Sequence, residues 1–110
     1  MGKDNTSARI ALEMLVLTVL ERRGPSHGYD IANVLRDWSA EAIQVQEGSL
    51  YPALHRMEEA GLVSATWTTT PLKRRARTYR ITRAGTRHLA GERDRWRHLA
   101  AGVARVLEHA

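Results

Sequence analysis

The chain has 110 residues and a mass of 12.4 kDa, which is the size of a single domain. Its 43% hydrophobic and 26% charged residues are typical of a globular protein and exclude a disordered tail. The absence of cysteine excludes disulfide scaffolds, zinc sites built from cysteine and thiol chemistry. A domain this small buries a modest core, so we expect a partner surface to contribute to its stability.

No segment of the sequence predicts contact with a membrane. The longest apolar stretch covers residues 14–20, whereas a membrane-spanning helix needs about 20 apolar residues. The first residues also lack the apolar region of a secretory signal. We therefore expect a cytoplasmic protein without a membrane partner.

Two helices are expected at the start of the chain. The first covers residues 8–22, where apolar residues occupy most of the helical wheel, and Gly24 and Pro25 end it. Ser26 predicts the N-cap of a second helix over residues 27–38. The residues of this second helix that we expect to face inward are Tyr29 or Ile31, Leu35 and Trp38.

A third helix is expected over residues 49–60, after a polar connection. Because proline is tolerated only in the first turn, Pro52 places the start near Gly48 and Ser49. Gly61 follows where a helix commonly ends in glycine. The helical wheel predicts an inner apolar face made of Leu50, Ala53, Leu54 and Met57.

The hydrophobic period then changes from helical to alternating. Residues 62–67 and 78–82 are short, β-prone segments, and Pro71 interrupts the basic segment 68–77 between them. This pattern predicts a β-hairpin with a long basic tip. Thr82 predicts the N-cap of a final helix that runs toward the C-terminus.

The order of these elements predicts a mainly α fold with a small β-hairpin. The second and third helices then form a helix-turn-helix, and the hairpin forms a wing beside it. We expect a winged helix-turn-helix domain over residues 8–82, followed by a C-terminal dimerisation helix over residues 83–110.

Positive charge is concentrated in the hairpin and the start of the last helix. The chain has a net charge of +5, but residues 1–67 hold six basic and nine acidic side chains. Residues 68–97 hold ten basic and two acidic side chains. A concentrated basic block beside a helix-turn-helix indicates double-stranded DNA as the partner.

The outer face of the third helix and the wing are the expected DNA contacts. Tyrosine, histidine and arginine reach phosphates or base edges, and a basic wing adds salt-dependent affinity. Tyr29 is either a phosphate contact near the start of the second helix or a core residue. The expected DNA-binding residues are Tyr29, Ser49, Tyr51, Pro52, His55, Arg56, Lys73, Arg74, Arg75 and Arg77.

Four segments of the chain resemble the PadR family of winged-helix transcriptional regulators. They read GPSHGYDI at 24–31, GSLYPALHRM at 48–57, EAGLV at 59–63 and RTYRITRAG at 77–85. One such segment alone would be a weak signal, but their order and spacing make the resemblance specific. It extends over nearly the whole chain and is typical of the family's small branch, which has a single C-terminal helix.

The resemblance implies a homodimeric repressor that responds to an effector and binds a palindromic operator. It also implies that the Tyr-Pro start of the recognition helix and the wing arginines face DNA. The matching positions in this chain are Tyr51, Pro52, His55 and Arg74 to Arg77. No catalytic or nucleotide-binding motif occurs, so we expect neither enzymatic activity nor a cofactor.

Apolar residues recur along the last helix with the spacing of a coiled-coil seam, although Glu92 interrupts it. Packing on the chain's own domain would give a similar pattern, but the first helix already supplies that core. We therefore expect a homodimer, whose twofold axis demands an inverted-repeat operator. The expected dimerisation residues are Leu89, Trp96, Leu99, Val103, Val106 and Leu107.

Trp96 lies in the middle of this seam and is large and flat. Its neighbours across the twofold axis either pack it closely, with no ligand, or leave a cavity. This helix resembles that of small members of the PadR family, in which aromatic side chains stack planar hydrophobic compounds between the subunits. The resemblance thus implies a small aromatic effector at Trp96, with Leu99 beside it.

Histidines near carboxylates in the last helix raise the question of a metal site. His88 with Glu92 and Asp94 with His98 are four residues apart, a spacing that suits a metal. Such pairs are usually local ion pairs, so we expect no metal.

Two alternative functions stay open: a dimer that sequesters a metal or drug, and a winged-helix module that binds an acidic protein. DNA binding would be secondary in both.

Overall fold

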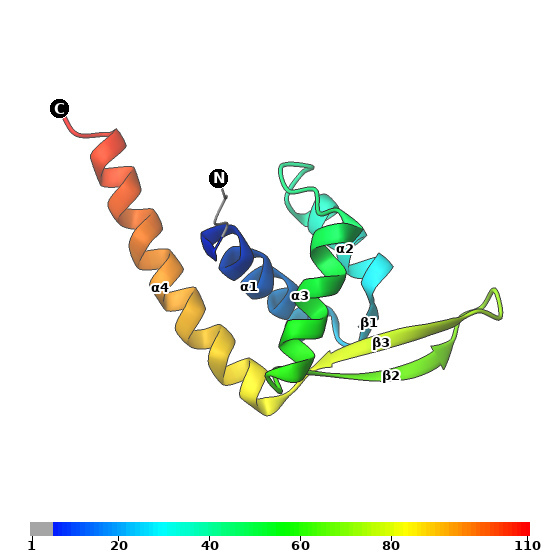
Figure 1. The fold of residues 1–110 in the computed structure, drawn as a ribbon. Helices are drawn as coiled ribbons and strands as arrows, with labels where there is room; N and C mark the ends of the chain where they lie inside the picture. Colours follow the sequence, from blue (N-terminus) through cyan, green and yellow to red (C-terminus); the bar gives the residue numbers. More distant parts are fainter. Residues whose placement is uncertain (1–5) are drawn as a thin grey trace.

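The computed structural model describes the backbone of residues 6–110 and the side chains from residue 11 onward. The described part contains four helices and a three-stranded antiparallel sheet of order β1-β3-β2 (Figure 1). This confirms the expected mainly α fold with a hairpin wing. The elements are α1 (Thr6–Arg23), β1 (Ser26–His27), α2 (Gly28–Trp38), α3 (Glu47–Glu59), β2 (Val63–Thr69), β3 (Arg75–Ile81) and α4 (Arg83–Leu107).

Helix α1 lies at the centre of the hydrophobic core. It contacts α2, α3, β3 and α4, because its apolar residues point in all directions around the helix. The inner face of α3 is buried as the helical wheel predicted. The fully buried large side chains of the core are Val16, Leu17, Val19, Leu20, Ile31, Leu50, Leu54, Met57 and Leu89.

The starts of α2 and α3 differ from the prediction. Ser26 is not the N-cap of α2: it pairs with Tyr79 in the sheet, and its hydroxyl donates to the carbonyl of Gly24 at 2.9 Å. Helix α3 begins at Glu47, so Pro52 falls in its second turn rather than its first. Because Pro52 has no amide hydrogen, the carbonyl of Gly48 lacks its helical hydrogen bond. Gly48 is exposed to solvent.

The wing, which we define as residues 63–81, has longer strands and a shorter tip than predicted. Its register runs from Val63 opposite Ile81 to Thr69 opposite Arg75, so the tip is residues 70–74. Thr68 and Thr69 extend β2, because β-branched residues favour extended backbone. The hydroxyls of Thr68 and Thr78 are 2.7 Å apart across the two strands.

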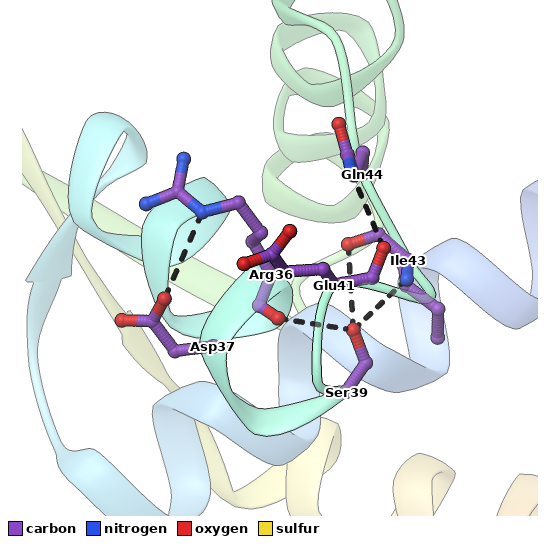
Figure 2. A network of polar contacts seen from close by, with 6 residues as sticks. All are labelled: Arg36, Asp37, Ser39, Glu41, Ile43 and Gln44. Atoms are coloured by element: carbon purple, nitrogen blue, oxygen red, sulfur yellow. Dashed lines mark hydrogen bonds and ion pairs between the residues drawn. The ribbon is translucent and has the colours of Figure 1, made fainter.

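The connection between α2 and α3 is held by a network around Ser39 (Figure 2). The Ser39 hydroxyl accepts from the amide of Ile43 at 2.9 Å and donates to the carbonyl of Arg36 at 3.3 Å. These contacts stabilise a tight turn in which Ala40 and Glu41 have positive φ. Trp38 is 54% exposed, contrary to the expectation that it faces inward, because the buried face of α2 ends at Leu35.

The start of α4 is hydrogen-bonded to the turn that follows α3. Thr82 is the N-cap, as predicted, because its hydroxyl accepts from the amide of Gly85 at 3.0 Å. The same hydroxyl donates to the carbonyl of Gly61 at 2.7 Å, and the Thr82 amide donates to Leu62 at 3.1 Å. A Cβ at Gly85 would lie 2.1 Å from the Leu62 carbonyl oxygen, so only glycine allows this approach.

The C-terminal half of α4 extends away from the domain, on the side opposite the wing (Figure 1). Closer to its start, Arg93 forms an ion pair with Glu21 of α1 at 2.9 Å. None of the helices within residues 6–110 combines the length and apolar character needed to cross a membrane.

Candidate nucleic-acid interface

The outer face of α3 is exposed, as expected of a surface that contacts DNA. Ser49, Tyr51, Pro52 and His55 are all exposed, and the first three lie in the N-terminal half of the helix. The His55 imidazole is 3.4 Å from the Glu59 carboxylate one turn later. Their roles in DNA binding stay predictions, and the structure gives them the access that such roles require.

Arg56 lies at the border of this face rather than on it. Its Nε is 3.2 Å from the Glu13 carboxylate of α1, and its side chain is only 34% exposed. The ion pair fastens α3 to the core helix and partly neutralises the guanidinium. Arg56 as a DNA contact stays a prediction, and its geometry favours a structural role.

A hollow of about 380 Å³ separates the starts of α2 and α3 from the wing. Tyr29 stands at its edge with 68% of its surface exposed, which excludes the alternative that it is a core residue. Tyr51 packs its ring on Gly28, and partial burial followed by the negative charge of Glu47 raises the pKa of its hydroxyl. The hydroxyl therefore stays protonated and can donate to an anion. The lining residues are His27, Gly28, Tyr29, Tyr51, Trp67, Arg75, Ala76, Arg77 and Tyr79.

The wing carries three exposed cations at and beside its tip, Lys73, Arg74 and Arg75. Among the side chains described, which begin at residue 11, none forms an ion pair with them. The Arg75 guanidinium lies 4.9 Å from the ring centre of Trp67, which orients it toward the hollow. These side chains are free to bind phosphates.

Arg77 differs from the other wing arginines because Glu58 of α3 already binds it. Its Nη1 and Nη2 donate to the two carboxylate oxygens at 3.1 and 2.8 Å. These hydrogen bonds raise the pKa of the guanidinium above its ordinary value. Its guanidinium also stacks over Trp67 at 5.7 Å and Tyr79 at 5.8 Å. Arg77 as a phosphate contact stays a prediction.

The sequence reasoning missed Glu58, Trp67 and Tyr79 as parts of this region. Side chains alternate between the two faces of a sheet, and this alternation could have indicated the positions of Trp67 and Tyr79. Trp67 is directly opposite Arg77, and Tyr79 follows two residues later on the same face of the sheet. The ion pair with Glu58 could not be predicted, because it depends on how the sheet packs against α3.

The exposed apolar face of α4 matches most of the expected dimer seam. Trp96 and Val103 are each 49% exposed and Leu99 is 56% exposed, with Val106 and Leu107 beyond them. Leu89 departs from the expectation, because its side chain is fully buried in the chain's own core. The unpartnered seam therefore starts at Trp96.

Metal ligands do not gather on this surface. Glu92 forms an ion pair with Arg95, one turn along α4, instead of pairing with His88. Among the described residues, no three histidine, aspartate or glutamate side chains come together as a group that could hold a metal ion.

Comparison with known proteins identifies the family. The model of the transcriptional regulator PadR-like family matches residues 16–91. A PadR family transcriptional regulator from Eggerthella lenta is 31% identical, with a TM-score of 0.72 over 96% of this chain and 93% of that one. A PadR-like transcriptional regulator from Bacillus cereus is 26% identical, with a TM-score of 0.75 over 90% and 93%.

A transcriptional regulator from Clostridium thermocellum is 23% identical and shares the fold, with a TM-score of 0.80 over 94% of this chain and 97% of that one. No curated protein matches the sequence significantly. The family match covers the helix-turn-helix, the wing and the first part of α4. The chain therefore belongs to the PadR-like family of transcriptional regulators.

Proposed function

We propose that this chain is a homodimeric, cytoplasmic repressor that binds an inverted-repeat operator and releases it when a small aromatic effector binds. Regulation of transcription through DNA, rather than catalysis, is the activity of its family. The observation that carries the proposal is that Tyr51 of the exposed α3 face and Arg75 of the wing line one hollow, and no described side chain forms an ion pair with Arg75.

In this proposal residues 8–82 form the DNA-binding domain. Ser49, Tyr51, Pro52 and His55 meet the major groove and its flanking phosphates, and Tyr29 reaches a phosphate beside them. Lys73, Arg74 and Arg75 lie along the backbone next to the groove, where each phosphate contact adds salt-dependent affinity.

Residues 83–110 supply the dimer contact. The large apolar side chains from Trp96 to Leu107 are 49–79% exposed on one helix face, and a second copy is the partner that presents an equal apolar face. The twofold axis then places two recognition helices about 34 Å apart, one turn of DNA.

The effector binds between the two copies of α4, beside Trp96 and Leu99. Leu99 also lines a shallow groove of about 500 Å³, together with His98, Gly102, Val103, Val106 and Leu107. Such a ligand relieves repression only if it binds the DNA-free dimer more tightly than the DNA-bound dimer.

The experiment that tests the DNA-binding proposal is selection of duplexes from a random-sequence pool by the full chain. We expect enrichment of an inverted repeat whose half-site centres are about 10 base pairs apart. The control is the double variant Arg74→Ala/Arg75→Ala, which should enrich the same sequence more weakly. If the wild-type chain enriches no sequence, the proposal is wrong.

A further inference from the structure

The ion pair between Glu58 and Arg77 joins the recognition helix directly to the wing. Glu58 lies in the last turn of α3, and Arg77 lies in the middle of β3, the central strand of the sheet. Both guanidinium Nη atoms donate to the carboxylate, at 3.1 and 2.8 Å. Two parallel hydrogen bonds fix orientation as well as distance, which a single contact does not.

The surroundings hold this pair in place. The two side chains are 35% and 30% exposed, so both are partly shielded from water. Trp67 and Tyr79 lie against the Arg77 guanidinium from the wing side. The Arg77 Nε is buried and has no hydrogen-bond partner among the described residues. About two thirds of the Arg77 side chain is therefore covered by the protein.

We propose that Glu58 and Arg77 are positioning residues: they set the distance and angle between the wing and α3, and thereby determine how well the protein discriminates its operator from other DNA. This inference rests on the proposed function. Base contacts from α3 carry sequence information, while phosphate contacts from the wing fix the register of the protein on the duplex. The correct operator satisfies both sets only if the two elements keep one relative position.

The negative charge of Glu58 allows a positioning role to be distinguished from a purely electrostatic effect on DNA binding. Glu58 is an acidic residue on the α3 and wing side of the domain, so its neutralisation should strengthen binding to any polyanion. A positioning role predicts the reverse for the operator, because the wing and α3 lose their fixed relation. Glu58→Gln keeps the size of the side chain and removes the ion pair alone.

The measurement uses two duplexes, the sequence that the wild-type chain enriches from a random pool and a shuffled version of it. For Glu58→Gln we expect the ratio of the two affinities to fall about tenfold, while affinity for the shuffled duplex stays equal or rises. The matched control is Glu41→Gln, the same change at an exposed glutamate between α2 and α3 whose side chain forms no ion pair with the described residues. It should leave the ratio unchanged.

Arg77→Lys provides a second, independent variant. Lysine keeps the positive charge but cannot form two parallel hydrogen bonds with a carboxylate. A positioning role predicts that Arg77→Lys loses discrimination as Glu58→Gln does, and that the double variant is no worse than either single one. The slope of log affinity against log salt on the shuffled duplex should stay constant. Thermal unfolding of each variant confirms that it is folded.

Two outcomes overturn the inference. Discrimination that is unchanged in Glu58→Gln would show that the pair does not position the wing. Arg77→Lys with wild-type discrimination would show that charge alone is required at that position. A wild-type chain that enriches no sequence is a different failure, because it removes the proposed function and this inference together.

Discussion

Gly28→Ala should displace the Tyr51 side chain without altering its chemistry. A Cβ at residue 28 would lie 2.7 Å from Cε1 of the Tyr51 ring and 2.9 Å from its hydroxyl oxygen. Contacts this short require one partner to move. Tyr51 is 42% exposed, so its side chain has room to move toward solvent, whereas Gly28 is held in the backbone at the start of α2. We therefore expect the ring to swing out of the hollow.

The cost in stability should be small, and the cost in DNA affinity larger. Moving the ring about 30° from its rotamer costs about 1 kcal/mol, and alanine favours the helix over glycine by up to about 1 kcal/mol. These terms nearly cancel in the free energy of unfolding. A hydrogen bond from the Tyr51 hydroxyl to a charged phosphate contributes about 1.5–3 kcal/mol, so operator affinity should fall by about tenfold or more.

A double-mutant cycle with Tyr51→Ala checks this reasoning by fluorescence anisotropy with labelled operator duplex. Gly28→Ala should weaken binding in the wild-type background and have almost no effect when Tyr51 is already alanine. Equal losses in both backgrounds would show that residue 28 acts through the α2 backbone. Unchanged binding of Gly28→Ala would refute the role of Tyr51 itself.

Three further predictions concern the seam, the wing and the effector. Val103→Asp leaves an unpaired charge in the seam, at a cost of about 3 kcal/mol, so sedimentation should detect monomers; Ala101→Asp, on the opposite helix face, should stay dimeric. Arg74→Gln and Arg75→Gln should each lower the slope of log affinity against log salt by about 1.8 for the dimer, which is about 0.9 for each of its two wings. Planar aromatic compounds should quench Trp96 fluorescence, less strongly when operator DNA is bound.

Each of these predictions has an outcome that contradicts it. A dimeric Val103→Asp variant would place the interface elsewhere. A constant salt slope after both wing changes would mean that the tip does not touch phosphates. Trp38 and Trp67 also fluoresce, so quenching that persists in Trp96→Phe would locate the ligand away from α4.

The hydrophobic pattern predicted which helix faces are buried, because burial follows a local period. The inner face of α3 and the wing hairpin were predicted for this reason. Ser26 was misassigned because its strand pairs with residue 79, far along the chain. Trp38 was misassigned because it is the last residue of α2 and lies beyond Leu35, where the buried face of this helix ends.

The candidate site likewise combines features that the sequence predicts with contacts that it does not predict. The sequence predicts where positive charge lies, but it does not predict which carboxylate lies next to each arginine. Arg56 meets Glu13, 43 residues away, and Arg77 meets Glu58, 19 residues away, only when the helices and sheet have packed. Similarly, a periodic apolar stripe does not tell whether Leu89 faces the chain's own core or a second copy.

The close contact of Gly85 with Leu62, in the turn after α3, and the packing of α4 on α1 fix the start of α4 to the DNA-binding domain. Between its start and Val103, α4 measures about 30 Å at 1.5 Å per residue. A rotation of about 6° at the seam then displaces the end of α3 by about 3 Å, nearly the 3.4 Å step between neighbouring bases. A ligand bound among the α4 side chains can thus move each recognition helix out of register with its half-site without touching α3.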